Sequence, residues 1–142
     1  MTIQQYKDKV LRLIDNINEF HISAAEQVAI SSLSLVKNRI QTQGLEGEVY
    51  SNAYANSSKF KRKGKNKNRV DLTDTARMMK EIQVTEVLIK NGKIVVRAGV
   101  RSAKYFKYNQ ERYGNFLTLN AEEKEILGNS FRKIYEREFR LK

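Results

Sequence analysis

The chain has 142 residues, a net charge of +11, 40% apolar and 30% charged residues, and no cysteine. These values fit one soluble globular domain over residues 1–142 with a modest core. The lack of cysteine excludes disulfides, thiolate nucleophiles and cysteine-type zinc sites. No apolar run approaches the roughly 18 residues that span a bilayer, and the polar N-terminus lacks the apolar core of a secretory signal. We therefore expect no membrane partner, and a protein that stays in the compartment where it is made.

The first forty residues carry helical periodicity. Apolar residues recur every three or four positions over 3–17, and again over 25–40. The first set is Ile3, Tyr6, Val10, Leu13, Ile14 and Ile17, and the second is Ala25, Val28, Ser32, Leu35, Val36 and Ile40. The phase slips over 18–23, where Asn, His and Ser gather, so the sequence predicts two helices with a break or kink between them. Gly44 is placed to end the second helix.

Residues 44–70 lose all periodicity and predict a long flexible arm without regular structure. Within it, residues 59–69 hold seven positive charges and no acidic residue. Like charges repel and cannot build a core, which favours a mobile loop. Three interpretations stand: a solvated loop that maintains solubility, a nucleic-acid arm with Phe60 available for stacking, or an arm that docks on an acidic partner surface.

The next segment contains a predicted β-hairpin. A short helix through 75–80, capped by Thr73 or Asp74, comes before two β-rich runs at 82–90 and 93–100. Asn91-Gly92 between the runs is the preferred dipeptide of a type I′ turn. That turn would pair Ile89 with Ile94, Val87 with Val96, and Glu86 with Arg97, with a bulge between Val84 and Val87. Both faces carry apolar residues, which predicts that both are covered.

The C-terminal part predicts two further helices. The first covers about 102–113. The second follows Asn120, which forms a capping box with Glu123, and runs to about Arg140. Its inward residues are predicted to be Leu127, Phe131, Ile134 and Tyr135. The order of helices, arm, hairpin and helices is that of an α+β fold.

The sequence shows no convincing catalytic or ligand group. His21 is the only histidine, and Glu122, Glu123 and Glu125 have the ordinary role of residues at a helix start. Gly44-Leu45-Glu46-Gly47 lacks the spacing and the lysine of a phosphate-binding loop. We therefore predict no catalytic residue, no metal site and no cofactor, and hence no enzyme.

Several segments together resemble the neck or tail-completion proteins of tailed bacteriophages, the head–tail joining group. Leu72-Thr73-Asp74-Thr75 matches a leucine-threonine-x-threonine motif of that family, with Ala76 in place of its glycine and Glu81 in place of a serine. Phe116-Leu117-Thr118-Leu119 matches a second motif, with Thr118 in place of glycine. The segments that carry the resemblance lie between about 25 and 140.

The resemblance implies a non-catalytic virion subunit. Such a subunit forms a homo-oligomeric ring between portal or adaptor and tail, and helps to close the DNA channel. The expected contacts to partner or packaged DNA are Lys59, Lys61, Arg62, Lys63, Lys65, Lys67 and Arg69. The expected contacts between subunits are Tyr50, Tyr54, Glu86 and Arg97. A related tail-terminator role stays open, and the alternative is a non-specific nucleic-acid-binding protein that uses the basic run at 59–69.

Overall fold

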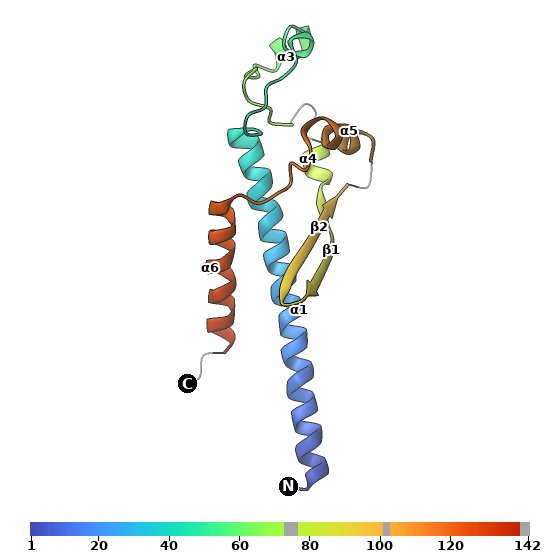
Figure 1. The fold of residues 1–142 in the computed structure, drawn as a ribbon, viewed down its shortest axis with the longest axis vertical. Helices are drawn as coiled ribbons and strands as arrows, with labels where there is room; N and C mark the ends of the chain where they lie inside the picture. Colours follow the sequence, from blue (N-terminus) through green and yellow to red (C-terminus); the bar gives the residue numbers. More distant parts are fainter. Residues whose placement is uncertain (73–76, 101–102, 140–142) are drawn as a thin grey trace.

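The computed structural model describes residues 1–72, 77–100 and 103–139, and it confirms an α+β fold. The cap predicted at Thr73 or Asp74 lies outside these residues. In chain order the elements are α1 (Ile3–Gln43), α2 (Asn52–Ala55), α3 (Ser58–Arg62), α4 (Arg77–Glu81), β1 (Gln83–Lys90), β2 (Lys93–Gly99), α5 (Ala103–Tyr113) and α6 (Ala121–Glu138). Figure 1 shows an elongated molecule arranged along α1.

Helix α1 is continuous, so the predicted break at 18–23 is wrong. Thr2 caps its start by accepting a hydrogen bond from the Gln5 amide, and Gly44 ends it with φ of 84°. No glycine or proline lies inside to interrupt it. The phase slip has another cause: the buried residues of α1 begin at Ala24, whereas the apolar residues before Asn18 are mostly exposed. The slip marks the point where the helix enters the body of the protein.

The hairpin forms in the predicted register. Ile89 pairs with Ile94, Val87 with Val96 and Glu86 with Arg97, and the register shifts between Val84 and Glu86, as the expected bulge requires. Asn91 and Gly92 have φ of 51° and 70°, which are the positive values that a type I′ turn needs. The local sequence was sufficient here because a two-residue turn fixes the pairing of both strands.

One face of the hairpin is less covered than predicted. The face that includes Val87 and Val96 lies toward α1, because both side chains line hollows shared with that helix. On the opposite face Leu88 is 40% exposed and Val95 is 39% exposed. The expectation of cover on both faces is therefore wrong within this chain.

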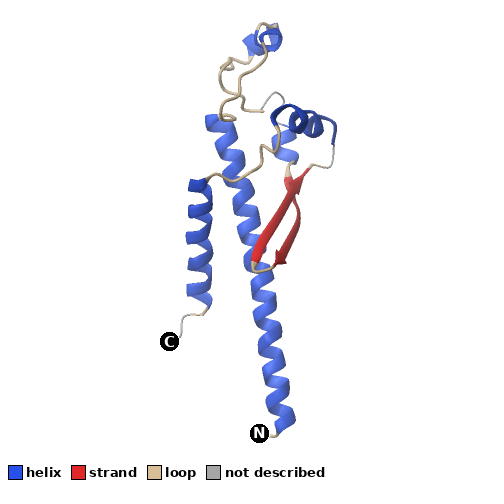
Figure 2. Ribbon diagram, viewed as in Figure 1, coloured by secondary structure: helices blue, strands red, loops and turns tan. Residues whose placement is uncertain are grey.

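Helices α1 and α6 lie side by side and run in opposite directions, with the hairpin along another side of α1 (Figures 1 and 2). The predicted capping box is confirmed, since Asn120 accepts from the Glu123 amide and Glu123 accepts from the Asn120 amide. The Arg39 Nε donates to the Glu123 carboxylate over 2.7 Å. Farther along, the Phe20 ring meets Tyr135 and Phe139 edge-on. The two helices are thus joined at both ends of their contact.

The hydrophobic core lies near the C-terminal end of α1. It joins that helix to the segment after it, to α4, to the start of β1 and to the region of α5. Its buried members are Val36, Ile40, Leu45, Tyr50, Phe60, Val70, Leu72, Met79, Ile82, Phe106 and Phe116. The part of α1 nearest the N-terminus extends beyond α6 and the hairpin (Figure 1).

Candidate functional site: the basic head

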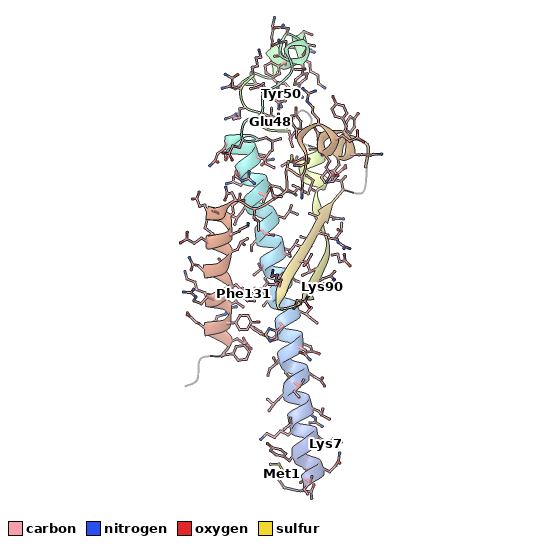
Figure 3. The ribbon with its side chains drawn as sticks, in the orientation of Figure 1. Met1, Lys7, Glu48, Tyr50, Lys90 and Phe131 are labelled. Atoms are coloured by element: carbon pink, nitrogen blue, oxygen red, sulfur yellow. The ribbon has the colours of Figure 1, made fainter. Side chains whose placement is uncertain are left out.

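Residues 44–72 form a small folded unit, here called the basic head, at the end of the molecule opposite Met1 (Figure 3). The prediction of a stretch without regular structure is wrong, because α2 and α3 both lie in it. Ser51 and Ser57 cap these helices by accepting from the amides of Tyr54 and Phe60. Two backbone hydrogen bonds tie the segment together, from the Leu45 amide to the Val70 carbonyl and from the Tyr50 amide to the Lys67 carbonyl, each 2.9 Å.

Three aromatic rings hold the head together. Tyr50, Tyr54 and Phe60 contact one another with centroid separations between 5.2 and 5.4 Å. Tyr50 and Phe60 are buried and belong to the main core. Because Phe60 is buried, it is not placed to stack on a nucleic-acid base, contrary to the sequence-based expectation. The sequence pattern did not indicate this cluster, because polar residues separate its three members along the chain.

Lys65 has a structural role within the head. Its Nζ donates to the Asp71 carboxylate over 2.7 Å and to the Tyr50 hydroxyl over 3.2 Å. The Tyr50 hydroxyl also donates to Asp71 over 2.8 Å. Both charged side chains are almost completely buried. Burial, followed by the hydrogen bond to Asp71, raises the pKa of Tyr50. Asp71 was missed by the sequence reasoning, although an acidic residue soon after a basic run is a recognisable signal.

Two more of the predicted contact residues form hydrogen bonds inside the chain, one within the head and one to α1. Lys67 Nζ donates to the Asn52 side-chain oxygen over 2.6 Å. Arg69 donates to the Thr42 carbonyl over 3.3 Å, and its side chain lies against Gly44. Both side chains keep exposed surface. Their charges contribute to the potential of the head while their positions are set by contacts within the chain.

The other four predicted contact residues are exposed on α3 and at its C-terminal cap: Lys59, Lys61, Arg62 and Lys63. We call this set the α3 patch. Phe60 anchors α3 in the core and thereby turns the neighbouring cations outward. Four exposed cations lie around one buried aromatic side chain, and together they form a surface suited to an anionic partner. The structure thus separates the seven predicted residues into an exposed patch and a supporting set.

The predicted subunit contacts lie in different environments. Tyr50 is buried within its own chain and Tyr54 is half-buried, so Tyr50 has little surface left for a neighbour. Glu86 and Arg97 form an ion pair of 2.5 Å on the hairpin and keep exposed surface. They lie across the strands from each other, beside the pair Leu88 and Val95. The hairpin residues are the part of this prediction that stays available for contact.

Two of the groups considered for catalysis, His21 and Glu123, have structural contacts. The His21 ring is hydrogen-bonded to the Tyr135 hydroxyl where α1 meets α6. Glu123 caps α6 and pairs with Arg39. Among the described residues, no three His, Cys, Asp or Glu side chains gather as a metal ion would require. No helix within the described part of the chain is long and apolar enough to cross a membrane.

Comparison with known proteins found no match to this chain among protein-family models, curated proteins or solved structures.

Proposed function

We propose that this chain is a structural subunit of a phage virion, or of a prophage-derived particle, at the head–tail junction. It would form a homo-oligomeric ring that joins portal or adaptor to tail and helps to close the DNA channel. The chain has no catalytic duty in this proposal. Its segments at 72–75 and 116–119, which resemble neck proteins, gave the hypothesis.

The observation that carries the proposal is the exposed apolar face of the hairpin. Leu88 and Val95 lie there as a cross-strand pair beside the ion pair of Glu86 and Arg97. An apolar centre with a charged edge is the composition of a protein–protein contact. On the side of an elongated subunit, such a face suits a lateral neighbour in a ring.

The α3 patch supports the same proposal from the end of the molecule. Lys59, Lys61, Arg62 and Lys63 would meet packaged DNA in the channel or an acidic surface of the portal or adaptor. Neither role requires base recognition, because phosphate contacts position a protein without reading sequence.

Removal of the gene from the phage or prophage that encodes it tests this proposal. Electron microscopy should show DNA-filled heads and tails that are not joined, and wild-type protein supplied in trans should restore joining. Supplied Val95→Glu protein should fail, because a charge would enter the apolar centre of the contact. Thr85→Glu is a matched control, since Thr85 lies at the bulge of β1 and is already exposed. Normal infectious particles without the gene would refute the proposal.

The alternative is a non-specific nucleic-acid-binding protein, which the exposure of the α3 patch favours. Under that alternative the isolated chain binds a random DNA duplex at physiological salt. Replacing the four α3 cations with Gln should then lower the slope of log K against log salt by about 3–4. Under the head–tail proposal the isolated chain binds the duplex weakly, and binding is lost at physiological salt.

A further inference from the structure

The N-terminal part of α1 has an apolar seam that the rest of the described chain does not cover. The seam consists of Ile3, Tyr6, Val10, Leu13 and Ile17. Ile3 is 91% exposed, Tyr6 63% and Leu13 52%. The next residue in the series, Phe20, packs on Tyr135 of α6 and on Phe139, the residue that caps the end of α6. The seam therefore ends where the chain begins to cover itself.

The spacing of the seam identifies the shape of its partner. Its members alternate in steps of three and four, which is the heptad pattern of a coiled coil. Ile3, Val10 and Ile17 occupy the a positions, and Tyr6 and Leu13 occupy the d positions. A heptad seam packs knobs into holes against another α-helix. In a parallel coiled coil, β-branched residues at a with Leu at d favour two strands. Every a position here is β-branched, and Leu13 is at d.

The charge of the N-terminal segment distinguishes a protein helix from nucleic acid or a membrane as the partner of the seam. Residues 1–20 carry three basic and three acidic side chains, so their side-chain charge is zero in a chain of net charge +11. Nucleic acid attracts positive charge, and helices that lie on anionic membranes carry Lys and Arg on their polar face. A neutral segment with balanced charges fits a protein helix better than either of these.

The positions beside the seam fit a second copy of the same segment. In a parallel pair in register, each g residue meets the e residue five positions later in the partner. Lys9 would then meet Ile14, Thr2 would meet Lys7, and Asn16 would meet His21, with no like-charge pair among them. Asp8, Asp15 and Arg12 fall at outer positions. Self-pairing therefore covers the seam without electrostatic repulsion.

We infer that residues 3–17 of α1 pair with the same residues of a second copy of this chain in a parallel, in-register coiled coil. The pairing would also stabilise the helix itself, since a segment of this length that extends from the body is marginal alone in water. This inference does not rest on the head–tail proposal. A neck ring whose subunits do not pair through residues 3–17 overturns only the inference, and a coiled-coil dimer absent from virions overturns only the function.

Two leucines of α1 provide a matched test. Leu13 lies on the seam, whereas Leu11 lies at an outer b position, and the two are nearly equally exposed at 52% and 49%. Light scattering after size-exclusion chromatography should show a dimer for the native full chain. Leu13→Asp should raise the dimer dissociation constant at least about tenfold, and Leu11→Asp by less than about twofold. Far-ultraviolet circular dichroism with thermal melting checks that both variants keep the folded body.

A disulfide trap tests orientation, because the native chain contains no cysteine. In the parallel pair Tyr6 faces Tyr6 of the partner, so Tyr6→Cys should give a reducible dimer under mild oxidation. Asp8→Cys, at the outer f position, should not. Three results would overturn the inference: a native chain that stays monomeric at high concentration, equal effects of the two leucine variants, or equal cross-linking by the two cysteine variants. A fourth result would also overturn it: if the monomer binds anionic phosphatidylserine vesicles and Leu13→Asp abolishes that binding, the seam contacts a membrane surface instead.

Discussion

At the scale of single residues, Glu123 illustrates how one carboxylate serves two contacts. One oxygen completes the capping box of α6 with the Asn120 amide, and the other accepts from Arg39 of α1. Arg39 also donates to the Thr118 carbonyl, so the guanidinium joins α1 to the segment that leads into α6. The pair is largely buried, with side-chain exposures of 18% for Arg39 and 6% for Glu123.

Glu123→Gln should separate the two contacts. Glutamine can still complete the capping box, but it leaves the Arg39 charge without its carboxylate. We expect a loss of about 1–3 kcal/mol in the free energy of unfolding, measured by urea denaturation. Glu122→Gln is the control, since Glu122 is exposed one position earlier in the same helix turn. Equal losses for both variants would show that the ion pair adds nothing beyond the helix start.

Tyr50 makes the stability of the folded head depend on pH in the alkaline range. Burial and the hydrogen bond to Asp71 raise the pKa of Tyr50 in the folded state above the ordinary value near 10. The resulting stabilisation is fully present below pH of about 10, and it is lost as the pH rises through the folded-state pKa. The unfolded chain releases the proton first, so unfolding becomes more favourable with pH.

We expect Tyr50→Phe to remove this dependence. Urea denaturation of wild type and variant between about pH 8 and 11 should show a difference in the free energy of unfolding. This difference should narrow as the pH rises above about 10. Tyr105→Phe, at an exposed ring on α5, is the control variant. A constant difference for Tyr50→Phe would mean that its hydroxyl is not held as described.

At the scale of elements, the junction between α1 and the head depends on Gly44. Its φ of 84° disfavours any side chain, and a Cβ there would lie 2.6 Å from the Arg69 Cγ and 3.2 Å from the Val70 nitrogen. Arg69 and Val70 belong to the irregular segment in which the head returns toward the end of α1. The close approach therefore fixes where the head leaves the helix.

Gly44→Ala should destabilise the protein more than Gly47→Ala does. Gly47 has a similar φ of 75°, but a Cβ there meets nothing within 4 Å. The backbone conformation should cost about 1 kcal/mol in both variants, and the collision at Gly44 should add about 1–2 kcal/mol. Thermal melting with both variants measures the difference. Equal melting temperatures would show that the segment of Arg69 and Val70 moves aside without cost.

At the scale of the whole molecule, the proposed contact surfaces lie at separate places. The basic head lies at one end, the exposed seam of α1 at the other, and the hairpin face along the side (Figures 1 and 3). Variants in the α3 patch should therefore alter binding of anions without changing dimer formation. Variants in the seam should do the reverse, because distant sites without shared partners act independently. This separation lets the tests of function and of self-association be interpreted independently.

The sequence alone determined the features that depend on near neighbours. The Asn91-Gly92 turn fixed the hairpin register, and Asn120 with Glu123 fixed the start of α6. Each is a local interaction whose geometry is set within a few residues. The helical periodicity of residues 3–40 was also correct, although the interpretation of its phase slip was not.

Only the tertiary structure decided the features that depend on distant residues. It joined Tyr50, Phe60 and Asp71 in the head, and so converted a predicted flexible arm into a folded unit. It divided the basic run into a buried Lys65 and an exposed α3 patch, which composition could not do because both kinds of lysine look alike in sequence. It also showed that α1 continues past the body with its seam exposed. The physical reason is that the burial of a side chain depends on which residues it contacts in the folded protein. Contacts between residues far apart in the sequence cannot be inferred from local sequence patterns.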